Sequence, residues 1–208
     1  MFLQETWLPC HESDTFTTDF PNYNFHSTSS DMYTDTEDRL LHTGAVWHGT
    51  VIGWSRNIDK HIKKLSPVNE RFCGILYSES NLEFSIIAYT LYMPTSGKDE
   101  EFLEVLELLR RDILENITEK SSIIIGTDSN VSAKSTKRRI TALHSFLEYF
   151  SLSSIHETQN ATFHHNKGTS ESQIDHIFVS TTPNQKLNVS MKSHLCVPAV
   201  PGQRISDI

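Results

Sequence analysis

The hydrophobic residues of this chain change their spacing near its middle. From Leu82 to Tyr92 they form a dense run with several β-branched residues, which is typical of a strand. From Asp99 to Thr118 they recur every three or four positions, which predicts an amphipathic helix with Ser96 as its cap. A second apolar run begins at Ile123. Strands and helices are therefore interleaved, and this order predicts an α/β domain.

The rest of the chain can be divided in the same way. Polar residues dominate between positions 10 and 45, which predicts a long loop with short strand pieces. A second helix is expected at Arg139–Phe150, where Ile140, Leu143 and Leu147 share one face. Further strands are expected at Phe2–Gln4, Gly44–Trp54, Arg71–Tyr77, Ala161–His164 and Gln173–Ser180.

Composition limits the class of protein. With 208 residues, 37% hydrophobic and 21% charged, the chain suits one globular domain spanning 1–208. No apolar run approaches the roughly 20 residues of a membrane span, and Met1–Glu5 does not resemble the start of a signal peptide. Three widely spaced cysteines favour reduced thiols over disulfides. We expect an intracellular protein, nuclear if it acts on DNA, and not a secreted one.

The net charge of −8 is not typical of a nucleic-acid-binding domain, but the local field at a site can differ from the average. Two basic clusters stand out, Lys60–Lys64 and Lys134–Arg139. The second begins four residues after Asn130, and its Lys137 and Arg138 could hold a phosphate backbone. The alternative is that this cluster is only the solvated start of a helix.

The stretch Ile123–Asn130 carries the clearest candidate site. Three isoleucines predict a short buried strand, and Gly126 is expected to let the backbone turn at its end. Asp128 and Asn130 follow two residues apart, so both side chains can be aimed at one point. This pattern is common in metal-assisted or water-activating sites. Asp and Asn also form ordinary turns, and this alternative stays open for the stretch alone.

Other polar residues recur at the edges of the expected strands. Glu5 ends the first strand, Tyr92 lies two residues before Pro94, and Asp175 opens a late strand. Asp207 is near the C-terminus. Each has a structural alternative as an exposed charge, a core residue or a turn former. Strand alternation places His176 on the face opposite to Asp175.

Taken in order, these motifs resemble the endonuclease/exonuclease/phosphatase superfamily, and above all the apurinic-type endonuclease domain of non-LTR retrotransposons. The resemblance implies a four-layer α/β sandwich, with two packed mixed sheets flanked by helices, here lacking the first and last strands. The matching segments are Phe2–Thr6, Gly44–Trp54, Arg71–Tyr77, Tyr89–Pro94, Gly126–Asn130 (with either one inserted residue or Thr127 as a departure), Thr162–Phe163 and Ser172–Ser180.

The resemblance also implies roles. Glu5 and Asp207 would hold Mg²⁺ or Mn²⁺, and Asp128 would orient or deprotonate the attacking water. Asn130 and Tyr92 would donate hydrogen bonds to phosphate oxygens. Asp175, counted among the catalytic residues, would orient a histidine that binds the phosphate and that follows the position of Asp207 in the family. DNA would be the partner, with no membrane and no obligate protein partner. The residues expected to bind substrate are Arg71, Thr162, Lys137 and Arg138.

Two departures from the family pattern bear on activity. The family motif Ser-Asp-His is replaced by Ser206-Asp207-Ile208, and isoleucine can neither donate a hydrogen bond nor carry a charge. The family's first strand, which bears an asparagine ligand, has no counterpart in this sequence. We therefore expect an incomplete, weak or inactive Mg²⁺-dependent endonuclease. The alternatives are a non-catalytic remnant that binds nucleic acid and a related phosphoesterase of the same superfamily.

Overall fold

The computed structural model describes residues 1–6, 14–29, 49–132, 135–155, 163–164, 171–172 and 174–180. The helices are α1 (Asp14–Asp19), α3 (Asp99–Asn116) and α4 (Lys137–Tyr149), with one 3₁₀ helix, η3 (Arg56–His61). The strands are β1 (Phe2–Gln4), β2 (Tyr23–Thr28), β3 (Thr50–Ser55), β4 (Ile62–Lys64), β5 (Phe72–Ser78), β6 (Ser85–Tyr92), β7 (Ser121–Asp128), β8 (Leu152–Ser154), β9 (Phe163–His164), β10 (Glu171–Ser172) and β11 (Asp175–Ser180).

Two sheets dominate the described part of the chain. The larger has six strands in the order β4-β5-β6-β7-β11-β8, and the smaller has three in the order β1-β3-β2. Strands β6 and β7 are parallel and are joined through α3, while the other pairs of the large sheet are antiparallel. The large sheet is therefore mixed, as the interleaved sequence pattern predicted. A separate pair, β9 and β10, forms a two-stranded ribbon.

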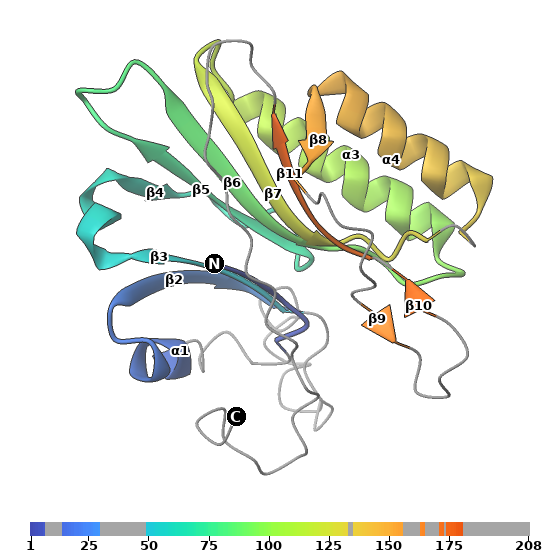
Figure 1. Cartoon of the computed structure of the whole chain (residues 1–208), viewed down its shortest axis with the longest axis horizontal. Coiled ribbons are helices and arrows are strands. Elements are labelled where there is room, and N and C mark those ends of the chain that lie inside the picture. Colours follow the sequence, from blue (N-terminus) through green and yellow to red (C-terminus); the bar gives the residue numbers. More distant parts are fainter. Residues whose placement is uncertain are drawn as a thin grey trace, which may run out of the picture.

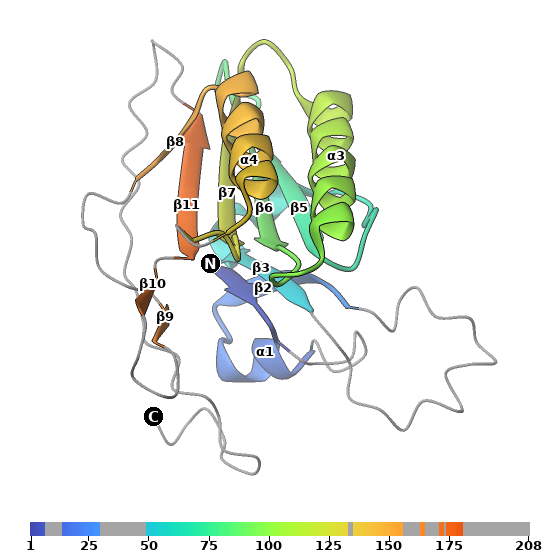
Figure 2. The same ribbon diagram turned by 90° about the vertical axis from the view of Figure 1, so that its right-hand side faces the viewer.

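The sheets and helices form four layers (Figures 1 and 2). Helices α3 and α4 cover one face of the large sheet, and the small sheet packs on the other face. Helix α1 lies on the outer side of the small sheet, where the ring of Phe16 is 5.5 Å from that of Phe25, between centroids. This arrangement confirms the expected α/β sandwich. Among the described residues, no helix has the length and apolarity needed to cross a membrane.

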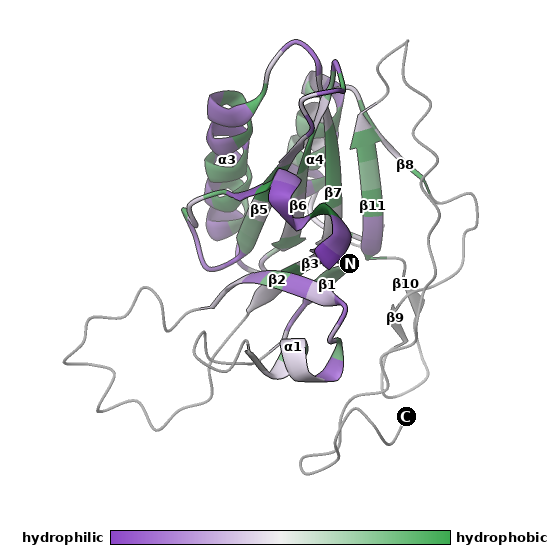
Figure 3. Ribbon diagram, turned by 90° about the vertical axis from the view of Figure 1, so that its left-hand side faces the viewer, coloured by the Kyte–Doolittle hydropathy of each residue, from purple (hydrophilic) through white to green (hydrophobic). Residues whose placement is uncertain are grey.

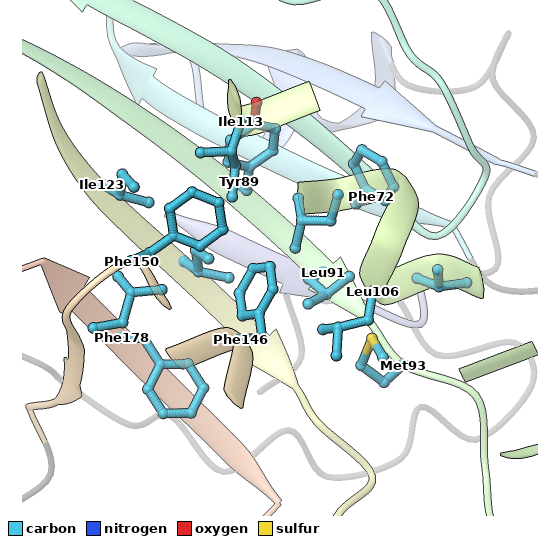
Figure 4. Packing of buried hydrophobic residues seen from close by; sticks show 14 of the residues in the cluster. Phe72, Tyr89, Leu91, Met93, Leu106, Ile113, Ile123, Phe146, Phe150 and Phe178 are labelled. Atoms are coloured by element: carbon cyan, nitrogen blue, oxygen red, sulfur yellow. The ribbon is translucent and has the colours of Figure 1, made fainter. Parts of the chain in front are cut away.

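The main core lies between the large sheet and the two helices (Figure 4). Rings from the strands and from α4 meet there, including Tyr89, Phe146 and Phe178, and Leu109 of α3 is fully buried beside them. Hydrophobic colouring follows the strands of the large sheet, whereas η3 is strongly hydrophilic (Figure 3). Burial of these side chains supplies the main driving force for this packing.

The alternation of side chains along β7 fixes which residues face which layer. Ile123 and Ile125 pack toward the helices, while Ile124 packs against the core next to the small sheet. Because successive side chains of a strand project to opposite faces, Gly126 and Asp128 also face the small sheet.

The structure corrects the expected role of Gly126. Strand β7 does not turn at this glycine but continues to Asp128. The glycine instead makes room for Phe2 of β1, since an added Cβ atom would lie 2.3 Å from the Phe2 ring. The close approach of the two sheets explains the glycine, and no feature of the local sequence distinguishes this need from a turn.

Three further expectations were wrong in detail. The N-cap of α3 is Lys98 rather than Ser96, and its side chain makes no capping hydrogen bond. Helix α4 begins at Lys137 and is capped by Thr136, whose hydroxyl accepts a hydrogen bond from the backbone N–H of Arg139. The polar segment contains a short strand, β2, as expected, but also the helix α1, which was not expected.

Candidate active site

Four of the residues singled out in the sequence form a row across the large sheet. Tyr92 pairs with Asp128 between β6 and β7, and Asp128 pairs with Asp175 between β7 and β11. Arg71, just before β5, joins the row because its carbonyl accepts a 2.8 Å hydrogen bond from the backbone N–H of Tyr92. Paired residues on neighbouring strands project from the same face. This polar row (Arg71, Tyr92, Asp128 and Asp175) therefore faces the small sheet.

Glu5 reaches the polar row from the small sheet. The side chain of the preceding residue, Gln4, donates hydrogen bonds to the hydroxyl of Thr90 at 3.1 Å and to the carbonyl of Gly126 at 3.2 Å. The Thr90 hydroxyl in turn donates to the carbonyl of Leu3 at 3.1 Å. These bonds join β1 to β6 and β7 immediately before Glu5, whose carboxylate accepts a hydrogen bond from the Tyr92 hydroxyl.

The Tyr92 phenol lies in a strongly anionic environment. Burial, the hydrogen bond to Glu5 and the charges of Glu5 and Asp128 raise the pKa of Tyr92 well above its usual value, while Arg71 opposes the shift. The Arg71 guanidinium lies 5.6 Å from the centre of the Tyr92 ring and is also hydrogen-bonded to Glu101 of α3. Tyr92 therefore remains a protonated phenol that can donate a hydrogen bond.

The pKa of the Asp128 carboxyl group is strongly raised. Its side chain is buried, and burial together with the charges of Asp175 and Glu5 raises its pKa to about 7. The backbone N–H of Asn130 donates to Asp128 Oδ1 at 3.0 Å and opposes the shift. A carboxyl group that titrates near neutrality can accept and release a proton under physiological conditions, which is the property required of a general base.

Asn130 is held at the end of β7 by two separate interactions. Its backbone is in the left-handed region, with φ of 48°, and its side-chain Nδ2 donates to the carbonyl of Met93 at 2.8 Å. The Met93 N–H donates to the Asp128 carbonyl at 2.9 Å, so the ends of β6 and β7 remain joined beyond the strands. Glu5 has φ of 52°. In the described part of the chain, two of the three non-glycine residues with positive φ thus lie at this site, where backbone strain often accompanies function.

His176 lies on the opposite face from Asp175, as the strand alternation predicted. It pairs with Thr127 rather than with Asp128, and its ring stacks on Phe178 with centroids 5.3 Å apart. His176 is therefore directed to the helix side of the sheet.

The expected substrate-binding residues differ in burial and in their partners. Arg71 is almost completely buried and engages Glu101 and Tyr92. Arg138 is exposed and forms an ion pair with Glu100 at the start of α3, while Lys137 is exposed at the first residue of α4. Thr162 and the expected metal ligand Asp207 lie outside the described residues. All these roles stay predictions.

The sequence does not predict the contacts that two residues beside the polar row, Gln4 and Arg139, make with the site. Gln4 was recognised only as part of a motif, yet it joins the two sheets. Arg139 was counted in a basic cluster, yet its guanidinium is buried and donates to the carbonyl of Pro94, two residues after Tyr92. No sequence signal separates Arg139 from the exposed Arg138 beside it.

The donors at the site suit a hard divalent cation. Glu5, Asp128 and Asp175 offer oxygen atoms only, and the charges of Asp175 and Glu5 add to burial in raising the pKa of Asp128. Within the described residues, no three His, Cys, Asp or Glu side chains form a ready metal site. Mg²⁺ is often held by one or two carboxylates together with water and substrate phosphates, so the residues fit a site of this partial kind.

Comparisons with known proteins identify the fold. No family model matches the chain, and no curated protein sequence matches it. Its fold nevertheless resembles that of the endonuclease/exonuclease/phosphatase proteins, which confirms at the level of the fold the resemblance inferred from the motifs.

Three solved structures illustrate this likeness. The first is a protein described by that family name from Bacteroides thetaiotaomicron, with 19% identity, a TM-score of 0.54 and coverage of 82% of this chain and 65% of its own. The second is an AP endonuclease from Archaeoglobus fulgidus, with 14% identity, a TM-score of 0.59 and coverage of 86% and 75%. The third is the endonuclease domain of TRAS1, a telomere-specific non-LTR retrotransposon, with 14% identity, a TM-score of 0.52 and coverage of 76% and 67%. At such identities the likeness concerns the fold, and this chain spans 65–75% of the lengths of the three structures.

Proposed function

We propose that this chain is a Mg²⁺- or Mn²⁺-dependent hydrolase of phosphodiester bonds in DNA, whose activity as an isolated chain is weak. The observation that carries the proposal is the buried Asp128, whose pKa is raised to about 7, lying in one row with Asp175 and with the Tyr92 phenol that is bonded to Glu5. The likeness in fold to an AP endonuclease and to a retrotransposon endonuclease domain supports DNA as the substrate.

Each residue of the site has a part in this proposal. Asp128 accepts a proton from the attacking water. Asn130, through its second amide hydrogen, and Tyr92, through its hydroxyl, donate to phosphate oxygens on which negative charge grows. Burial, together with the charge of Asp175, raises the pKa of Asp128 and so makes it a stronger base.

The cation would be held by Glu5, with Asp207 as a second candidate ligand. When bound, it would polarise the phosphate and offset negative charge on the leaving oxygen. Because Tyr92 donates to Glu5, a cation on Glu5 would also release this hydroxyl for the substrate.

Nicking of supercoiled plasmid tests the proposal. We expect slow, Mg²⁺-dependent conversion of supercoiled to open-circular DNA that is abolished by chelation. Asp128→Asn should lower the rate by about 10²–10⁴-fold, the usual contribution of a positioned base. Glu104→Gln, an exposed substitution on the outer side of α3, should leave the rate unchanged. Nicking that Asp128→Asn does not reduce would refute the proposed mechanism.

A second candidate function is nucleic-acid binding without hydrolysis. It is favoured by Ile208, which stands where the family motif has a histidine and can neither donate a hydrogen bond nor carry a charge. In that case the purified chain would bind DNA but not nick it with Mg²⁺ or Mn²⁺. Binding that involves phosphate contacts should weaken steeply as salt rises, and salt-insensitive or absent binding would count against this candidate.

A further inference from the structure

The turn that follows Tyr92 is held by two side chains from different parts of the chain. Asn130, beyond β7, donates from Nδ2 to the carbonyl of Met93 at 2.8 Å. Arg139, in the first turn of α4, donates to the next carbonyl, that of Pro94. The two consecutive carbonyls after the catalytic phenol are therefore both fixed by side chains rather than by a strand ladder.

Arg139 is placed where a charge is costly. Its side chain is 1% exposed, and burial lowers its pKa despite the charge of Asp99. Its guanidinium carbon lies 4.3 Å from the centre of the Phe102 ring, and its Nε is 3.7 Å from Asp99 Oδ1. Within the described part of the chain, Nε and Nη1 have no hydrogen-bond partner, so the bond to Pro94 is the main polar contact of this group there. Burial of an incompletely paired guanidinium is unfavourable, and an apolar residue would fill this space at lower cost.

We propose that Arg139 is a positioning residue, which fixes the Met93–Pro94 turn and thereby holds the Tyr92 hydroxyl at the polar row. This inference rests on the proposed function for its catalytic consequence, but its structural part does not. Since small displacements of a positioned group can cost about 10²-fold in rate, the turn needs a fixed geometry. Arg139 connects this turn to both helices, because Phe102 belongs to α3 and Arg139 to α4.

The chain offers a matched control. Arg110 of α3 also bridges the two helices, with its guanidinium carbon 4.8 Å from the centre of the Tyr149 ring of α4, but it does not contact the turn. Arg139→Met, Arg139→Lys and Arg110→Met should be compared with the original protein by thermal unfolding. The ring signal of Tyr92 should be followed by NMR with carbon-labelled tyrosine and assigned through its loss in Tyr92→Phe. Values of kcat and KM are measured on a DNA oligonucleotide with Mg²⁺.

We expect Arg139→Met to shift the Tyr92 signal and to lower kcat roughly 10–100-fold with little change in KM. In Arg139→Lys, the Tyr92 signal and kcat should both lie closer to those of the original protein. Arg110→Met should change neither the Tyr92 signal nor kcat. A folded Arg139→Met protein with an unchanged Tyr92 signal would overturn the inference, and so would unfolding of both Arg139 variants, which would make Arg139 a core residue only. If no variant and not even the original protein nicks DNA, the proposed function fails, while the Tyr92 signal still decides the role of Arg139.

Discussion

Asp128 ties the stability of the protein to pH. Its pKa of about 7 in the folded chain lies above the usual value of roughly 4 for an unfolded aspartate. Between these values the folded state binds more protons than the unfolded state. Protonated Asp128 therefore contributes stability that is complete below about pH 4 and is lost as the pH rises through 7. The loss should be on the order of a few kcal/mol, since each pKa unit corresponds to about 1.4 kcal/mol.

Urea unfolding of the metal-free protein at pH 5 and pH 8 measures this effect. The original protein should lose stability across this range relative to Asp128→Asn, which cannot ionise at this position. Asp59→Asn serves as the matched control, because hydrogen bonds from Asn24 and Trp54 hold the pKa of Asp59 below its usual value, so that this group stays ionised throughout. Equal pH dependence in all three proteins would contradict a raised Asp128 pKa.

At the level of single residues, the sequence predicted some members of the site better than others. The spacing of Asp128 and Asn130 after an apolar strand predicts that they lie side by side at its end, because the strand itself sets their position. Their contact is a hydrogen bond from the Asn130 backbone N–H to Asp128 Oδ1, whereas the Asn130 side chain donates to the Met93 carbonyl. Arg138 and Arg139 could not be distinguished, since neighbours on a helix differ by about 100° in direction and only the packing of α4 on α3 decides which one is buried.

At the level of elements, the docking of β1 on β7 depends on the absence of a side chain at position 126. Gly126→Ala would bring a Cβ atom to 2.3 Å from Cγ and 2.6 Å from Cβ of Phe2. Such overpacking should cost about 1–3 kcal/mol in the free energy of unfolding. The measurement is a double-mutant cycle with Phe2→Ala, which removes the ring. The double variant should lose less stability than the sum of the two single variants, and simple additivity would contradict the contact.

The regularity of the hydrophobic pattern decides which helices and strands the sequence alone predicts. Strands β6 and β7 and helix α3 have long, regular hydrophobic patterns, so the sequence alone indicates their type. Strand β2 has Phe25 as its one buried apolar residue in a polar stretch, and it exists because it pairs with β3 along six residues. Pairing with a distant strand leaves little trace in a short local pattern.

At the level of the whole molecule, the site is shared between the two sheets. The polar row belongs to the large sheet, while Glu5 belongs to the end of β1 in the small sheet and is joined to the row through the Tyr92 hydroxyl. A cation held by Glu5 and facing Asp128 and Asp175 would relieve the electrostatic repulsion between the Glu5 carboxylate of the small sheet and the two aspartates of the large sheet. Binding to the folded state alone must then stabilise the whole fold.

This reasoning predicts a metal-dependent rise in melting temperature without any substrate. At ten times its dissociation constant, Mg²⁺ should add about 1.4 kcal/mol to the free energy of unfolding, which corresponds to a shift of a few degrees for a chain of this size. Glu5→Gln should remove most of the shift, because it removes the charged ligand on the small sheet. Glu104→Gln on α3 removes an equal charge away from the polar row and should keep the full shift. An equal shift in both variants would mean that Mg²⁺ acts through general screening, and that Glu5 does not link the two sheets through a bound cation.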